Sequence, residues 1–348
     1  IQMLKEAGFN VVPVIGRSTE SLNKYFIENK MQYFDSKAKP KKNRILNLLN
    51  LTIKYRKTAK LAMKQYNKDD IIILGTADTA IAAYGIYNHT KYVLSLKELY
   101  ERPIYYQIIL RHLSKKSSGI ICCERNRARI IKFRWKLDKL PYVISNKPFY
   151  HPKERYLKPT CSKTSDVIKL FEGNPIIIYQ ARHIHFTDEI INLAKGLKDA
   201  NARYTLVLMG TVDNEEDIKK INDIYPYTIW TNHIPAPHHM EVTSYASIGV
   251  AIYEESSLNN LFCAPNKTFE YAGYGIPSLC NDVPGLVETI GIWHAGECVD
   301  WNSPSQITEA INNITSKYND YSKRTLEFFE SEDNLKLIKE MINEIKSI

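Results

Sequence analysis

The chain has 348 residues and a mass of 40.2 kDa, with 44% apolar residues, 24% charged residues and a net charge of +9. This is enough apolar material for two cores, and the aromatic content of 11% excludes a disordered chain. No run reaches the roughly 18 to 20 apolar residues that span a bilayer, and no fixed repeat recurs. The six cysteines form no C-x2-C pair, which favours reduced thiols. We therefore expect a globular protein of two domains.

The first predicted domain covers residues 1–150. Residues 1–8 read as the end of a helix that stops at a glycine. Because an α/β domain usually starts with a strand, we expect a first strand that precedes these residues. Alternating apolar segments then indicate βαβ units and a parallel sheet. The predicted strands are 9–15, 71–74, 91–96, 119–123 and 142–145, and the predicted helices are 43–66, 76–87, 104–114 and 124–136.

The charge of the chain is divided unevenly along its length. Residues 1–165 carry 33 basic and 12 acidic side chains, whereas residues 166–348 carry 14 and 26. The first part therefore has a net charge of +21 and the second a net charge of −12. Eleven basic residues and no acidic one lie between Asp35 and Asp69, and a second basic cluster lies on one face of the predicted helix 124–136.

Three interpretations fit this positive charge. Basic faces with interleaved aromatic residues suit the anionic headgroups of a membrane, the backbone of a nucleic acid, or solvent alone. The absence of a nucleic-acid motif and the net charge of +21 on residues 1–165 favour an anionic membrane surface, with no nucleic acid. We therefore expect a cytoplasmic protein at the inner face of the cytoplasmic membrane.

A second domain of the same design is predicted after a linker. Pro148, Pro152 and Pro159 stand among charged residues and mark a linker at 151–165. The second domain is expected at 166–320, and a helix over 321–348 is expected to pack back on the first domain. The predicted strands are 176–179, 204–209, 228–230, 248–253 and 277–281, and the predicted helices are 187–197, 214–224, 238–247, 267–274, 303–315 and 321–348. The predicted fold class is α/β, with two facing, doubly wound domains.

The segment 254–284 holds the densest chemical signal. A loop at 265–267 enters a helix, so that free backbone N–H groups and the Lys267 cation meet at one end. Glu270 follows one turn later, where it can accept hydrogen bonds from ribose hydroxyls. The pattern suits a nucleoside diphosphate, although a surface pair between Lys267 and Glu270 is the simpler alternative.

This segment resembles the donor-site signature of GT-B glycosyltransferases, in the bacterial branch of glycosyltransferase family 4. The family pattern S-L-N, P-N-K-x-F-E-Y, G-x-P matches residues 257–259, 265–271 and 275–277. Residues 176–182 look like the first strand and loop of the family's donor domain, and residues 206–210 look like its next strand and glycine turn. Residues 4–11 and 143–146 are also similar to family segments. The resemblance implies a GT-B fold, with its first strand missing here, and transfer of a sugar from a nucleotide donor.

The resemblance also implies roles for individual residues. Glu270 would bind the donor ribose, Arg182 and Lys267 would neutralise the leaving diphosphate, and backbone amides would hold phosphate or sugar. The family is retaining, and no Asp-x-Asp metal motif occurs in the sequence, so neither a metal nor another cofactor is expected. The acceptor is expected to be a lipid-linked saccharide in surface (capsule) polysaccharide synthesis. The other implied donor-site residues are Gly210, Ser257, Leu258, Asn259 and Asn266.

The sequence departs from the family pattern at three places. Phe262 stands where many members carry a first glutamate, and His183 and His185 lie in the region of an absent Lys-Gly pair. Where related proteins show His-Glu, the chain has Lys97 and Glu98. Glu98 is thus either an acceptor-side carboxylate or an exposed glutamate at a helix start. Phe262 and the absent Lys-Gly pair keep open the alternative of a non-catalytic nucleotide-binding scaffold. A nucleotide-sugar 2-epimerase is a second alternative, because the resemblance is to a fold that also hosts such enzymes.

Two histidine pairs carry no site prediction. His183 and His185 could be metal ligands, but no cysteine or carboxylate stands at a matching spacing. His238 and His239 open a predicted helix and are expected to be exposed.

Overall fold

The computed structural model describes residues 1–101 and 103–347, without the side chain of Arg44. The chain divides into two compact units, Ile1–Ser145 with Asp333–Ile348, and Asn146–Glu332. The boundary therefore lies at residue 145 rather than 150. The predicted linker 151–165 belongs to the second unit. Arg155 attaches it to the rest of that unit, because the Arg155 guanidinium donates hydrogen bonds to the carbonyls of Ser244 (2.8 Å) and Ala246 (2.7 Å).

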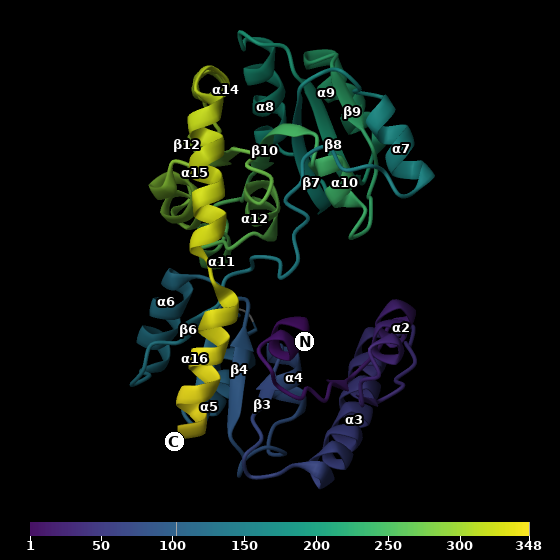
Figure 1. Ribbon diagram of the computed structural model, residues 1–348, viewed down its shortest axis with the longest axis vertical. Coiled ribbons are helices and arrows are strands. Elements are labelled where there is room, and N and C mark those ends of the chain that lie inside the picture. Colours follow the sequence, from purple (N-terminus) through teal and green to yellow (C-terminus); the bar gives the residue numbers. More distant parts are fainter. Residues whose placement is uncertain (102, 348) are drawn as a thin grey trace. The chain divides into compact units, whose positions relative to one another are not determined.

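The first unit holds a four-stranded parallel sheet in the order β3-β4-β5-β6 (Figure 1). A separate parallel pair, β1 with β2, lies apart from it. Every residue of β4 is buried, as expected of a continuous apolar strand in the middle of a covered sheet. The strands are β1 (Val14–Ile15), β2 (Phe34–Asp35), β3 (Ile72–Leu74), β4 (Tyr92–Leu96), β5 (Gly119–Cys122) and β6 (Tyr142–Val143).

Seven α-helices belong to the described part of the first unit, and one of them comes from the end of the chain. They are α1 (Gln2–Glu6), α2 (Glu20–Glu28), α3 (Arg44–Ala62), α4 (Ala77–Ala82), α5 (Ile104–Ser114), α6 (Arg125–Trp135) and α16 (Asn334–Ser347), with a 3₁₀ turn η1 (Met63–Gln65). The apolar face of α16, which includes Ile338, Met341 and Ile345, packs against Val93 of β4 and Ile121 of β5. The chain thus returns to its first unit to cover this sheet (Figure 1).

The second unit is built on a six-stranded parallel sheet in the order β12-β11-β10-β7-β8-β9. This is the strand order of a Rossmann sheet, in which the direction of the chain reverses between the first and fourth strands, here β7 and β10. The strands are β7 (Ile176–His183), β8 (Thr205–Thr211), β9 (Thr228–Trp230), β10 (Ala246–Ala251), β11 (Ser278–Asn281) and β12 (Gly296–Val299).

Helices cover both faces of this sheet. Alternate residues of β7 point to opposite faces, so Ile177 packs in the core with α8, α9 and α14, and Ile178 in the core with α7, α10 and α12. The helices are α7 (Ser162–Lys169), α8 (Asp188–Lys198), α9 (Glu215–Ile224), α10 (His239–Thr243), α11 (Leu258–Leu261), α12 (Asn266–Ala272), α13 (Pro284–Leu286), η2 (Val287–Gly291), α14 (Pro304–Ser316) and α15 (Tyr318–Ser331).

The structure corrects several predicted elements. The single helix expected over 321–348 is two helices, α15 in the second unit and α16 in the first, and Ile348 lies outside the described residues. Helix α7 lies partly within the predicted linker, and α2, β2 and β12 were not predicted. The predicted strand 9–15 is regular only at Val14–Ile15. Among the described residues, no helix is both long and apolar enough to cross a membrane.

Candidate functional site

The carboxyl ends of β7 and β10 form the point at which the sheet of the second unit reverses direction. Ligands of such sheets bind in the crevice outside these strand ends. Arg182 and His183 end β7, while Tyr253 and the segment that leads to α11 follow β10. Eight of the nine predicted site residues belong to this unit, and Glu98 belongs to the first.

Lys267 is the second residue of α12, and its side chain lies against residues of β7 and of the segment that follows β10. Its Nζ lies 4.9 Å from the ring centre of Tyr179 on β7 and 5.7 Å from that of Tyr253, which follows β10. Burial of the ammonium lowers the pKa of Lys267 to about 8, and the Glu270 carboxylate offsets part of this shift. The lysine is thus a desolvated cation held between two aromatic faces, which favours binding of an anion there.

Glu270, one turn further along α12, is held by residues from two other elements. Its Oε2 accepts a hydrogen bond of 2.5 Å from Nε2 of Gln180 on β7. Its Oε1 lies 3.4 Å from Nε2 of His239 on α10. Gln180 is fixed in turn, since its side-chain oxygen accepts a hydrogen bond of 2.6 Å from Thr243. Glu270 is therefore in contact with Gln180 and His239, and within residues 1–101 and 103–347 the simple surface pair with Lys267 is not formed.

Gly210 and Arg182 lie on the neighbouring strands β8 and β7. A Cβ atom at Gly210 would lie 2.5 Å from the carbonyl oxygen of Ala181 and 2.9 Å from Cγ1 of Ile184, so only glycine permits this approach. The close approach accompanies a shift in register between β7 and β8 after Gln180. The Arg182 side chain is exposed, and its carbonyl accepts a hydrogen bond from Thr211 (3.0 Å).

The predicted segment 257–259 forms the start of the short helix α11. The Ser257 side chain caps this helix by accepting a hydrogen bond from the Asn260 amide (3.2 Å), while Leu258 and Asn259 are its first two residues. Asn266 is exposed at the first position of α12, which begins one residue earlier than predicted. The Ser257 hydroxyl is therefore already bound by a backbone amide of its own segment.

Glu98 follows β4 in the first unit and lies in a loop, not at a helix start as the alternative interpretation held. Its carboxylate is half-exposed and lies 3.8 Å from the buried guanidinium of Arg127 on α6. Arg127 also donates to the carbonyl of Lys97. Glu98 is thus an accessible carboxylate whose position is steadied by a buried cation.

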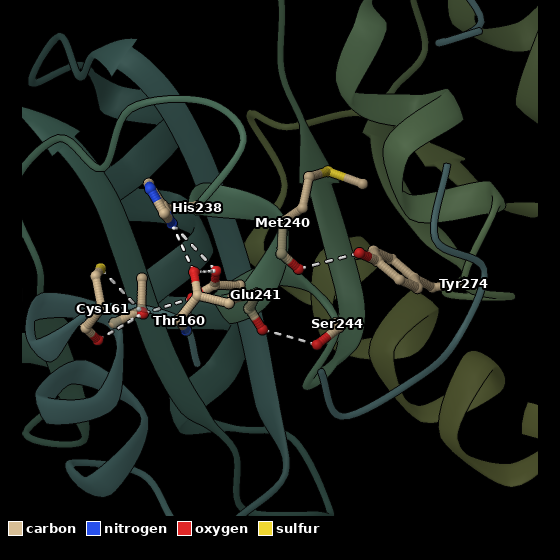
Figure 2. A network of polar contacts seen from close by, with 8 residues as sticks. Thr160, Cys161, His238, Met240, Glu241, Ser244 and Tyr274 are labelled. Carbon is tan, nitrogen blue, oxygen red and sulfur yellow. Dashed lines mark hydrogen bonds and ion pairs between the residues drawn. The ribbon is translucent and has the colours of Figure 1, made fainter. Parts of the chain in front are cut away.

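A polar network holds α10, and with it His239, in place (Figure 2). The carboxylate of Glu241 accepts hydrogen bonds from Thr160, from Thr164 (2.5 Å) and from its ion-pair partner His238 (3.1 Å). On the other side of α10, the Tyr274 hydroxyl donates to the Met240 carbonyl (3.1 Å) (Figure 2). The helix that carries His239 is therefore anchored on both sides.

Sequence reasoning missed or misjudged several of these groups. His239 is largely buried beside Glu270 rather than exposed, and His238 is bound to Glu241. The polar Gln180 at the end of an apolar strand was the one available signal for the Glu270 contact. The sequence showed no carboxylate at a metal-ligand spacing from His183. In the structure, however, Asp213 Oδ2 lies 3.2 Å from His183 Nε2.

Two clusters have the donor types that bind transition metals. One consists of His183, His185 and Asp213, which are largely exposed, and the other of Cys161, His238 and Glu241. In the second cluster, hydrogen bonds from the chain already occupy both carboxylate oxygens of Glu241.

The sequence matches no model of a known protein family, and no curated protein is found as a relative. Solved structures, by contrast, match it over nearly its whole length. A glycosyltransferase from Rickettsia africae has a TM-score of 0.68 at 15% identity, with 99% of this chain and 91% of that one covered. Sucrose-phosphate synthase from Thermosynechococcus elongatus has a TM-score of 0.66 at 15% identity, with 98% and 89% covered.

Anabaena HepE, in complex with UDP and glucose, has a TM-score of 0.64 at 13% identity, with 95% of this chain and 90% of that one covered. At these identities the likeness concerns the fold. The chain has the α/β fold with two Rossmann-like domains that these glycosyltransferases share, and the predicted GT-B fold is confirmed.

Proposed function

We propose that the chain is a glycosyltransferase that takes a sugar from a nucleotide-sugar donor bound to its second unit. The observation that carries the proposal is the placement of Lys267 and Glu270 at the reversal point of a Rossmann-ordered sheet. Anabaena HepE, which has the same fold, is known in complex with UDP-glucose. A cation and an oriented carboxylate at this place match the diphosphate and the ribose of such a donor.

The chemistry of the transfer fits these residues. When the bond between the sugar and the donor phosphate breaks, negative charge develops on the leaving nucleoside diphosphate, and fixed cations stabilise it. Lys267 and the exposed Arg182 supply such charges, while Glu270 accepts hydrogen bonds from the ribose hydroxyls. We propose a retaining reaction that needs no metal, with the fixed cations in the place of a divalent ion.

In this proposal the acceptor binds to the first unit. Glu98 is an accessible carboxylate in a loop after β4, and we assign it to the acceptor side. The net charge of +21 on residues 1–165 favours an acceptor at an anionic surface. A lipid-linked saccharide at the cytoplasmic face of the membrane, in the synthesis of a surface polysaccharide, has this chemistry.

Two other functions make different predictions. A nucleotide-sugar 2-epimerase would convert its substrate without any acceptor, and a scaffold protein would bind nucleotide without turnover. Phe262 at the position of a family glutamate is the observation behind the scaffold alternative. Product analysis with a nucleotide sugar alone distinguishes the epimerase from a transferase.

The test is a thermal-shift panel of UDP, GDP, ADP, CMP and dTDP, with and without EDTA. A ligand at 100 times its Kd stabilises the folded state by about 2.7 kcal/mol. We expect one nucleotide to raise the melting temperature of the wild type regardless of EDTA, and Glu270→Ala to lose this shift. Glu172→Ala, which changes an exposed carboxylate elsewhere in the same unit, should keep it. Failure of every nucleotide to shift the wild type would refute the donor site.

A further inference from the structure

Helix α3 in the first unit exposes an apolar stripe to solvent. Ile45 (70% exposed), Leu49 (52%) and Ile53 (54%) recur every four residues, and Leu46 (58%) lies beside them. A spacing of four places side chains on one face of a helix. Single exposed leucines are common on protein surfaces, but a continuous row of large apolar side chains marks an interaction site.

The opposite face of α3 holds it on the first unit. Tyr55 and Ala59 are buried there, and Leu51 lies against Gly16 at the end of β1, where an added Cβ would come within 3.3 Å of it. The exposed stripe is therefore not the face by which the helix packs in its own unit. Figure 1 shows α3 along one side of this unit, beside α2.

The second half of the same face is positive. Lys57 and Lys60 are exposed and continue the stripe at helical spacing, and Lys64 is exposed in the 3₁₀ turn η1 that follows α3. The loop before the helix adds exposed lysines at its other end, including Lys41 and Lys42. The sequence contains no acidic residue between Asp35 and Asp69. Within residues 36–68, apolar side chains thus lie between two groups of cations, and this segment contributes no carboxylate.

This combination selects one kind of partner. A second copy of the chain that met this face symmetrically would bring lysines against lysines. A nucleic-acid backbone would pair with the lysines but would leave the leucines and isoleucines without a partner. Anionic phospholipids satisfy both, since apolar side chains enter the boundary between headgroups and acyl chains while lysines meet the phosphates.

We propose that the exposed face of α3 and of the turn η1 that follows it, from Ile45 to Lys64, docks the chain on an anionic phospholipid bilayer. The proposal extends the membrane part of the proposed function and rests on it, but it is independent of nucleotide binding. Because lysines would meet the lipid phosphates, binding should weaken as the salt concentration rises. Because leucine and isoleucine side chains would enter the lipid, binding should also weaken when these side chains are replaced by polar ones.

The test is sedimentation with vesicles of phosphatidylcholine that contain 30% phosphatidylglycerol, and with vesicles of phosphatidylcholine alone. The variant Leu46→Gln/Leu49→Gln/Ile53→Gln keeps good helix-forming residues at exposed positions, so its fold is preserved. The matched control is Ile104→Gln/Ile108→Gln on α5. This pair is also exposed, and it lines a groove of about 640 Å³ elsewhere in the same unit.

We expect the wild type and the α5 control to bind the anionic vesicles alike, and the α3 variant to bind at least tenfold more weakly. Lys57→Gln/Lys60→Gln/Lys64→Gln should weaken binding similarly, and high salt should release the wild type. Equal binding by the α3 variant, loss in the α5 control instead, or equal binding to neutral vesicles would overturn the proposal. So would a wild-type dimer that the α3 variant abolishes. The nucleotide thermal shift, measured on the same variants, reports separately on the donor site.

Discussion

His239 Nε2 lies 3.4 Å from Glu270 Oε1, and Gln180 Nε2 lies 2.5 Å from the second carboxylate oxygen of the same residue. Both oxygens of Glu270 therefore face nitrogen atoms of the protein, and the carboxylate is held in one orientation. Thr243 extends this arrangement, because its hydroxyl donates to the side-chain oxygen of Gln180. A carboxylate held in this way is ordered before a nucleotide arrives, which lowers the entropic cost of binding.

Gln180→Leu should weaken nucleotide binding. The substitution keeps the volume of this buried side chain but removes the hydrogen bond to Glu270. A hydrogen bond to a charged group contributes about 1.5 to 3 kcal/mol, which corresponds to a loss of affinity of roughly 10- to 100-fold. Titration calorimetry with the nucleotide selected by the panel measures it. Thr243→Val should have a smaller effect through the same route, and an unchanged Kd in folded Gln180→Leu would contradict this role.

Nucleotide affinity should fall as the pH rises through the pKa of Lys267, which is about 8. Below this pH the ammonium is charged and attracts phosphate, whereas above it the cation is lost. If only the charged form binds, affinity at pH 9 is about tenfold lower than at pH 7. Calorimetry at both pH values should find this change in the wild type. Lys267→Arg, which stays charged, should bind with a flat pH profile, and a flat profile in the wild type would rule out the mechanism.

The same lysine makes a second prediction for the protein without ligand. The pKa of Lys267 is about 8 in the folded state, below its ordinary value of 10.5. Between pH 8 and 10.5 the unfolded chain binds more protons at this lysine than the folded protein does. The cost of burying a charged ammonium therefore falls as the pH rises, and the free energy of unfolding should increase with pH in this range. Urea denaturation of wild type and Lys267→Met from pH 7.5 to 10 measures it. The rise should be absent from the methionine variant, and a rise of equal size in both proteins would assign it to another group.

The sequence predicted the parts of this site that are local in the chain. The apolar run 176–178 has the continuous pattern of a buried parallel strand, and the motif 265–271 located the start of α12 to within one residue. The contacts of Glu270 are not local: Gln180 is 90 residues from Glu270 and 63 from Thr243. Only the fold brings them together, so residue spacing could not predict them.

The elements that were missed have physical reasons of their own. Strand β2 contains only two residues, too few for an alternating pattern to be visible. Helix α7 follows a proline-rich segment, and that composition favoured a linker. Its first turn is fixed by a distant contact, the hydrogen bond between Thr164 and Glu241. Helix α16 was not separated from α15 in the sequence, but its packing against β4 and β5 agrees with the predicted return of the chain's end to the first domain.

Gly210→Ala should destabilise the second unit by about 1 to 3 kcal/mol, as expected when a methyl group is forced into a packed site. The neighbour that it meets is the backbone carbonyl of Ala181, at 2.5 Å, which cannot move without shifting the end of β7. Urea denaturation measures the change, and the nucleotide Kd should rise as well because Arg182 follows Ala181. Gly75→Ala is the matched control: no atom lies within 4 Å of its added Cβ, and stability should hardly change. Equal stabilities for both variants would show that β8 tolerates the shift.

Glu241 should make the second unit sensitive to acid. Burial alone raises the pKa of its carboxyl, but the hydrogen bonds from Thr160, Thr164 and His238 outweigh burial and lower the pKa to about 2 (Figure 2). In the unfolded chain this carboxyl has its ordinary pKa of 4.5. Because the folded pKa is the lower one, the stabilisation is complete above pH 4.5 and is lost as the pH falls towards 2.

Glu241→Gln should therefore lose stability at pH 7, by about 3 kcal/mol if the whole difference in pKa is expressed. The loss should shrink as the pH falls from 4.5 towards 2, because the wild type loses the same contribution there. Urea denaturation of both proteins at pH 7, 4.5 and 3 measures this convergence. Thr164→Val removes one donor while keeping the buried volume, and it should show a smaller loss with the same pH dependence. A difference that stays constant from pH 7 to pH 3 would mean that packing, and not the ionised carboxylate, accounts for the effect of Glu241.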